Sequence, residues 1–230
     1  LSSLGVEQSS GSFECTPAVS ADGRYVAFTT IHRFIGVDYG TDRDAFLRDR
    51  SAGTTELVSW SSDGSQAAGG WSPSMNSDAT LVAYTSNSHF THLLDTDSLD
   101  DIFIRNTITD SNELVSIATT GVSGSGHSGR ARMTPDGRYV AFDSESTDLD
   151  SVDTNDARDA FLRDRSAGTT ELVSYTTTGA VSSYNGGIHT PGCTAPAVSG
   201  DGRYVVFASD NPDMGPLGTA GVFLRDRTLG

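Results

Sequence analysis

A phrase that recurs at a nearly constant interval restricts the possible folds of this chain more than any other feature. The leucines of the repeated Glu-Leu-Val-Ser phrase, Leu57, Leu114 and Leu172, are 57 and 58 residues apart. A second phrase, of the form Asp-Gly-Arg-Tyr-Val-Ala-Phe, occurs four times, in segments that start at Ser20, Asn76, Thr134 and Ser199. The 230 residues therefore form four repeats of one unit, and we expect residues 1–230 to make a single domain.

Each repeat contains four short segments with the alternation and composition of β-strands. In the first repeat these are the residues around 17–20, 24–28, 46–50 and 55–59, and an Asp-Gly turn signal separates the first two. No segment has sustained helical periodicity. Four antiparallel strands repeated four times indicate an all-β, four-bladed β-propeller, and a stacked solenoid is the alternative. We expect a closed ring, because the segment from Leu1 matches the segment from Leu57 and would complete the last blade.

The repeated phrases resemble those of a known group of proteins. The segments Asp22–Phe28 and Asp136–Phe142 read Asp-Gly-Arg-Tyr-Val-Ala-Phe, and the segment Asp153–Ser174 combines an aspartate-rich stretch with Phe-Leu-Arg-Asp-Arg and Glu-Leu-Val-Ser. Both are similar to the TolB-like, WD-type β-propeller repeats of secreted and envelope bacterial proteins. The resemblance covers nearly the whole chain and implies the fold. It does not imply one function, because this repeat serves many roles.

The charge of the chain argues against two classes of partner. The net charge is −15, and all 15 basic residues are arginine. Nucleic acids and anionic membrane surfaces attract cations, so we expect neither partner. No apolar run approaches the roughly 20 residues of a membrane-spanning helix, so we expect no membrane insertion.

Aspartates recur at fixed spacing before the third strand of three repeats. Calcium binds about 6–8 oxygen atoms, which alternate carboxylates and one backbone carbonyl of a tight loop can supply. We expect two calcium sites, in the second and third repeats. A third candidate site lies in the first repeat, where Gly40 replaces one ligand. The alternative is a solvated acidic turn that caps its own backbone. The predicted ligands are Asp95, Asp97, Leu99 and Asp101, then Asp153, Asn155, Ala157 and Asp159, then Asp38, Asp42 and Asp44.

The long connections between strands differ in every repeat and should lie on one face of a propeller. Binding residues usually occur in variable loops on a rigid scaffold, so this face is the predicted ligand site. Aromatic rings and histidines there suit a glycan or another extracellular protein. The residues chosen are Trp71, His127, Tyr184 and His189.

Cys15 and Cys193 occupy nearly equivalent places in the first and fourth repeats, which would be neighbours in a closed ring. We therefore expect a disulfide between them, with two separate thiols as the alternative. A disulfide together with calcium loops indicates secretion, to the cell envelope or outside the cell.

No catalytic motif is evident, so the leading functional interpretation is a secreted, calcium-stabilised, non-catalytic binding module. Two alternatives remain. One is a polysaccharide-degrading enzyme, a lyase or hydrolase, with its site on the variable face. The other is a structural domain of a larger surface protein. The recurring Arg-Asp-Arg phrase is interpreted as a source of ion pairs between strands, because one active site would not be repeated in three blades.

Overall fold

The computed structural model describes residues 17–31, 43–64, 68–88, 91–176, 179, 196–209, 212–214 and 220–229. These residues form β-strands and a single 3₁₀ turn, η1 (Pro212–Met214), and include no α-helix. None of them belongs to a helix with the length and apolar character needed to cross a membrane. The prediction of an all-β chain is confirmed for this part of the molecule.

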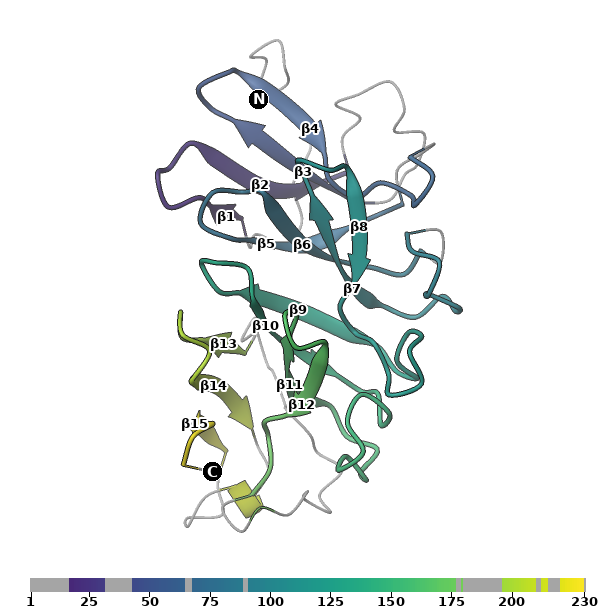
Figure 1. Cartoon of the computed structure of the whole chain (residues 1–230), viewed down its shortest axis with the longest axis vertical. Coiled ribbons are helices and arrows are strands. Elements are labelled where there is room, and N and C mark those ends of the chain that lie inside the picture. Colours follow the sequence, from purple (N-terminus) through teal and green to yellow (C-terminus); the bar gives the residue numbers. More distant parts are fainter. Residues whose placement is uncertain are drawn as a thin grey trace.

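The strands form four antiparallel sheets, and each sheet pairs its strands in chain order (Figure 1). The first sheet contains β1 (Ala18–Val19), β2 (Tyr25–Thr30), β3 (Asp44–Asp49) and β4 (Thr54–Leu57). The second contains β5 (Trp71–Met75), β6 (Leu81–Ser86), β7 (Asp101–Asn106) and β8 (Ser111–Leu114). The third contains β9 (Ser128–Met133), β10 (Tyr139–Ser144), β11 (Asp159–Asp164) and β12 (Thr169–Leu172). The fourth contains β13 (Ala197–Val198), β14 (Tyr204–Ser209) and β15 (Gly221–Asp226).

An aromatic pair lies at the centre of every sheet, between its second and third strands. The two rings face each other across the ladder because their residues are register partners. Ring centroids are 5.9 Å apart in the first three sheets and 6.0 Å apart in the fourth. This separation is typical of favourable aromatic contacts, so the repeated sequence produces the same internal anchor four times. The pairs are Phe28–Phe46, Tyr84–Phe103, Phe142–Phe161 and Phe207–Phe223.

Neighbouring sheets pack face to face through alternate residues of the third strand. The aromatic residue at the centre of the strand belongs to the core shared with the preceding sheet, as Phe103 and Phe161 do. The residues on either side of it belong to the core shared with the following sheet, and all of them are at most 5% exposed. These flanking residues are Ala45 and Leu47, Ile102 and Ile104, and Ala160 and Leu162.

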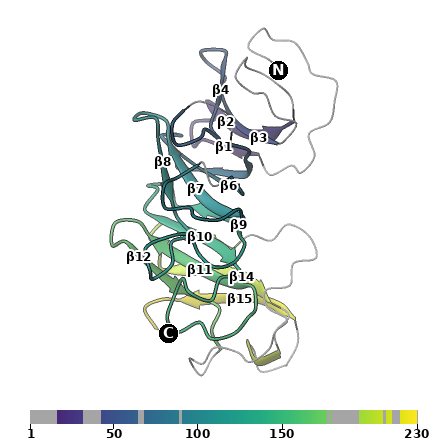
Figure 2. The same ribbon diagram turned by 90° about the vertical axis from the view of Figure 1, so that its right-hand side faces the viewer.

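In the part of the chain that the structure describes, the sheets form an open series, and the predicted closed ring is not found. In Figures 1 and 2 they follow one another along the long axis, and the first and fourth sheets lie at opposite ends. At the flanking positions of the fourth sheet, Val222 is 73% and Leu224 is 65% exposed, and Val19 at the other end is 58% exposed. The matching repeat ends in the sequence indicated which sheet the N-terminal segment could complete. They carried no information on the angle between sheets, which depends on the packed side chains. Residues 1–16, the proposed closing segment, lie outside the described residues.

Ion pairs join the second and third strands in three of the sheets, as the Arg-Asp-Arg phrase predicted. Arg138 Nη2 lies 2.7 Å from Asp164 Oδ2 in the third sheet, and Arg24–Asp49 and Arg203–Asp226 repeat this pair. Asp164 also accepts hydrogen bonds from the backbone N–H groups of Ser166 and Ala167. The Arg138 guanidinium and these N–H groups lower the pKa of Asp164 from 3.8 to about 2.

The lowered pKa gives a prediction for Asp164→Asn. A carboxylate whose pKa is lower in the folded state stabilises that state above its unfolded pKa, and the effect is lost as pH falls through the folded pKa. We expect Asp164→Asn to have a lower Tm than the parent chain at pH 7. The difference should shrink as pH falls from about 4 to about 2. Thermal unfolding followed by circular dichroism over this range checks it, with Asp156→Asn, at an exposed loop position, as the control. A difference that stays constant with pH would contradict this account of Asp164.

Candidate functional site

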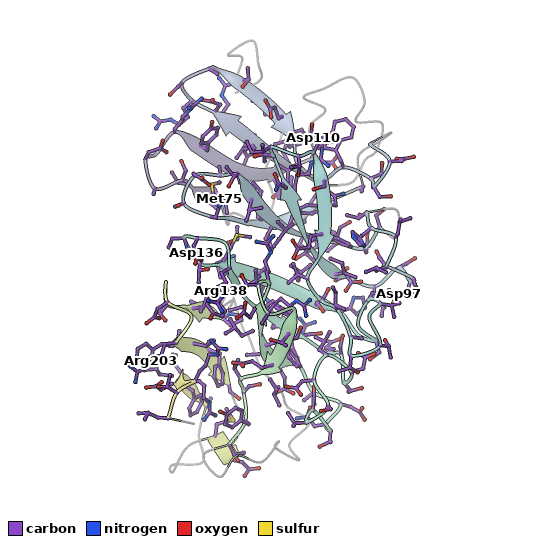
Figure 3. The ribbon with its side chains drawn as sticks, viewed as in Figure 1. Met75, Asp97, Asp110, Asp136, Arg138 and Arg203 are labelled. Atoms are coloured by element: carbon purple, nitrogen blue, oxygen red, sulfur yellow. The ribbon has the colours of Figure 1, made fainter. Side chains whose placement is uncertain are left out.

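Three long connections meet at one end of the strands of the second and third sheets. They are residues 91–100 of the β6–β7 connection, 115–127 between β8 and β9, and 145–158 between β10 and β11. The middle connection joins the other two, because Ser123 N–H donates to the Leu94 carbonyl (2.9 Å) and Thr119 N–H donates to the Asp148 carbonyl (2.8 Å). We call these three segments the loop face. In Figure 3 its residue Asp97 lies on the opposite side from Asp136, Arg138 and Arg203 of the tight turns. The predicted separation of variable loops from short turns is therefore present here.

The predicted ligands of the second repeat come together on this face. One carboxylate oxygen from each of Asp95, Asp97 and Asp101 lies within 4.8 Å of the others. The loop is folded by its own side chains, because Asp95 Oδ1 accepts from Asp97 N–H (3.2 Å) and Asp97 Oδ1 accepts from Leu99 N–H (2.7 Å). Side chains two residues apart are thereby turned toward one point, which is the arrangement that a chelating loop requires.

Asp101 is the buried member of this group. It is the first residue of β7 and is fully buried, with one carboxylate oxygen accepting from the Ser116 hydroxyl at 2.5 Å. Its Oδ2 accepts no hydrogen bond from the described residues. Burial, assisted by the nearby charges of Asp95 and Asp97, raises the pKa of Asp101 to about 8. A bound cation would favour the ionised carboxylate and would satisfy the remaining oxygen.

The third repeat has the same loop geometry with one amide in place of a carboxylate. Asp153 Oδ1 accepts from Asn155 N–H (3.3 Å), and Asn155 Oδ1 accepts from Ala157 N–H (2.9 Å). Asp159 begins β11 and accepts from the Ser174 hydroxyl at 2.6 Å. Burial raises the pKa of Asp159, and burial together with the Asp159 charge raises the pKa of Asp153 to about 6. Leu99 and Ala157, the predicted carbonyl ligands, thus occupy equivalent places in two similar loops.

The first and fourth repeats differ from this pattern. Asp44 begins β3, is buried, and accepts from the Ser59 hydroxyl at 3.0 Å, so it matches Asp101 and Asp159. Asp38 and Asp42, the other predicted ligands of the first repeat, lie outside the described residues. In the fourth sheet Gly221 stands where the other three have aspartate, so this carboxylate is absent.

The serine of the Glu-Leu-Val-Ser phrase is a site residue that the sequence analysis did not assign. Besides donating to the buried aspartate, its hydroxyl accepts the backbone N–H that follows this aspartate, at 2.9–3.1 Å in the three sheets. The serine therefore fixes the carboxylate relative to the strand. Its recurrence two residues after the marker leucine was visible in the sequence, but nothing there linked it to an aspartate 15 residues earlier. The serines are Ser59, Ser116 and Ser174.

A second group missed by the sequence analysis is particular to the third sheet. Asp143 is fully buried and lies between Arg130 (2.8 Å) and Arg158 (3.2 Å). The same strand position holds Thr85 in the second sheet. In the sequence, the only sign of this group was an aspartate where another repeat has threonine. That difference indicates a special site only once the position is known to be buried.

Two of the four predicted ligand-contacting residues are described. Trp71 is the half-buried first residue of β5, and His127 immediately precedes β9. The two strands are neighbours, because Met133 N–H donates to the Ser74 hydroxyl at 3.2 Å. His127 Nδ1 accepts from Asp100 N–H at 3.0 Å, which joins this histidine to the aspartate-rich loop. Tyr184, His189, Cys15 and Cys193 lie outside the described residues, so the remaining ligand positions and the disulfide stay predictions.

Comparison with solved structures shows a TolB-like β-propeller fold. Similar structures include TolB from Acinetobacter baumannii (TM-score 0.56, 17% identity) and a putative TolB from Agrobacterium tumefaciens (TM-score 0.53, 17% identity). A prolyl endopeptidase is similar with a TM-score of 0.51 and 12% identity. The matches cover 94%, 83% and 93% of this chain but only 41%, 52% and 27% of those chains, respectively. No protein-family model matches the sequence, and no curated protein matches it significantly. At these identities the similarity establishes the fold and leaves the function open.

The serine–aspartate pair gives a prediction for Ser116→Ala. The substitution removes the hydrogen bond to the buried Asp101 carboxylate and leaves the Ile102 N–H without its acceptor. We expect a loss of about 1–3 kcal/mol in the free energy of unfolding. Urea denaturation measures it, and Ser151→Ala, at an exposed position of the loop face, should change little. Equal stability of Ser116→Ala and the parent chain would show that the pair does not hold the site.

Proposed function

We propose that this chain is a calcium-stabilised β-propeller module that binds a glycan or another extracellular protein through its loop face. The observation that carries the proposal is the group Asp95, Asp97 and Asp101, in which a fully buried carboxylate closes a loop of converging carboxylates. The third repeat supports it, because it builds the same loop from Asp153, Asn155 and Asp159.

Calcium suits these groups better than other common metals. The donors are carboxylate and amide oxygens in a flexible loop, whereas zinc prefers nitrogen and sulfur and magnesium retains its own waters. A divalent ion would reduce the repulsion that contributes to the raised pKa of Asp101 and Asp153. The proposal includes one ion in each of the second and third repeats, and a further one in the first if Asp38 and Asp42 complete the site of Asp44.

The ions would hold the loop face in one conformation. The connection 115–127 donates to both aspartate-rich loops, so fixing either loop also fixes the segment between them. His127 accepts from the Asp100 N–H of the second-repeat loop, and Trp71 pairs with Thr85 near the end of β6, the strand that leads into that loop. A tryptophan ring suits the apolar face of a sugar. Calcium sites of modest affinity work where calcium is abundant, which favours a place in the cell envelope or outside the cell.

Calcium should stabilise the chain in a way that depends on specific aspartates. We expect added calcium to raise Tm and chelator to reverse the rise, and binding at a hundredfold excess over Kd would contribute about 2.7 kcal/mol for each site. Asp97→Asn should lose the response of the second loop. Asp100→Asn removes the same charge from the same loop at a position that is not a predicted ligand, so it should keep most of the response. Scanning calorimetry with calcium and chelator measures both, and an unchanged Tm in the parent chain would reject the calcium proposal.

The ligand class can be tested by native gels cast with a panel of polysaccharides, with calcium present. We expect retardation in one polysaccharide, its loss in Trp71→Ala, and its partial retention in Trp71→Phe, which keeps an aromatic face. Released oligosaccharide would establish an enzyme in place of a binding module. Free migration in every gel would reject a glycan ligand and direct the search to protein partners.

A further inference from the structure

On the side of the tight turns, an arginine side chain joins neighbouring sheets at two of the three junctions between them. At the junction of the second and third sheets, Arg165 donates from Nε and Nη2 to the Glu113 carboxylate (3.0 and 2.6 Å) and from Nη1 to the Gly137 carbonyl (2.6 Å). Arg165 follows β11 and Glu113 belongs to β8, so the bond crosses from one sheet to the next. Bidentate pairs of this kind are among the strongest hydrogen-bonded ion pairs in proteins.

The junction of the third and fourth sheets has an equivalent clamp. Arg227, which follows β15, donates to both oxygens of Glu171 in β12 and to the Gly202 carbonyl (2.6 Å). Its guanidinium also lies over the Tyr139 ring, 5.2 Å from the centroid. Two junctions of this chain therefore hold a guanidinium group between a glutamate and a turn carbonyl, and one adds a tyrosine ring.

The junction of the first and second sheets keeps the acceptors but lacks the arginine. Thr107 follows β7 at the position of Arg165 and Arg227, and its short hydroxyl donates to the Ala79 carbonyl (3.1 Å), the counterpart of the Gly137 and Gly202 carbonyls. Glu56 in β4 corresponds to Glu113 and Glu171, and its exposed carboxylate makes no ion pair within the described part of the chain. This junction therefore has the glutamate of the other two junctions but has threonine in place of their arginine.

A cavity of about 170 Å³ lies where the guanidinium would be. Both sheets line it, and none of its lining residues is basic. Among the described residues, Arg24 is the only guanidinium over the Tyr25 ring, at 4.7 Å, whereas the equivalent Tyr139 ring faces two, those of Arg138 and Arg227. The negatively charged groups in its lining are Asp49, Glu56 and Asp78.

We propose that this cavity binds a guanidinium group supplied from outside the chain, either by an arginine side chain of a partner protein or by a small guanidinium compound. The Glu56 carboxylate would accept two parallel N–H bonds, the Ala79 carbonyl would accept a third, and the Tyr25 ring would lie against the planar group. A lysine ammonium fits less well, because it lacks the planar fork that both other junctions use and the flat face that lies over Tyr139 at one of them. The site lies at the tight turns and does not depend on the calcium loops. Asp110, from the same turn as Thr107, lies apart from Asp97 in Figure 3.

The proposal is tested with three single-residue probes that differ only at the end of the side chain. These are N-acetyl-arginine amide, N-acetyl-lysine amide, and N-acetyl-citrulline amide, which replaces the guanidinium with a neutral urea. We expect the arginine probe to cause saturable amide chemical shift changes at residues 54–56 and 107–108 in NMR spectra, and the other two to cause much smaller ones. Glu56→Gln should retain the fold and lose the saturable change. The absence of saturation with the arginine probe, or equal saturation with the lysine probe, would overturn the proposal.

Filling the cavity from within the chain gives a second, independent readout. Thr107→Arg restores the residue type of the other junctions, so we expect a higher Tm than the parent chain and no remaining binding of the arginine probe. Thr109→Arg adds the same charge two residues later, at an exposed position outside the cavity, and should change neither property. Circular dichroism establishes that each variant is folded. A folded Thr107→Arg chain that still binds the arginine probe would place the binding elsewhere and overturn the assignment.

Discussion

The packing of one sheet face on the next is the interaction on which the rest of this structure depends. In the second and third sheets, the third strand places an aromatic residue in the core shared with the preceding sheet and two flanking apolar residues in the core shared with the following one. A single sheet with two apolar faces would expose both of them to water, so each repeat needs at least one packed neighbour. Val222 and Leu224 show the consequence, since the same positions that are buried in three sheets are exposed at the end of the series.

This packing also determines where the chemistry of the chain can lie. In the first three sheets the aspartate that opens the third strand is at most 5% exposed, because it adjoins the apolar core. In the second sheet this residue, Asp101, also ends the loop that carries Asp95 and Asp97. A carboxylate so placed has little access to water and needs a compensating partner. The serine that follows the next strand donates one hydrogen bond to it, and a cation in the loop would balance its charge. Core and loop are therefore linked through one residue in the second repeat and one in the third.

Because the chain repeats one unit, each repeat serves as a control for the others. Departures from the shared pattern then carry most of the information on specialised sites. Thr107 in place of an arginine leaves a cavity beside Glu56, and Asp143 in place of Thr85 introduces a buried carboxylate between two arginines. Gly221 removes the buried aspartate from the fourth sheet altogether. Each departure lies at a position whose role is defined by the other sheets.

The sequence by itself determined the strands, their order and the two sides of each sheet, because the period of the repeat and the alternation within it are local properties. It also located the aspartate loops, since ligands such as Asp95, Asp97 and Asp101 are close along the chain. Only the tertiary structure decided how far the series of sheets bends, because the angle between them depends on side chains packed from separate repeats. Likewise, the pairing of Ser116 with Asp101 and the cavity between Glu56 and Thr107 join residues whose proximity no local pattern encodes.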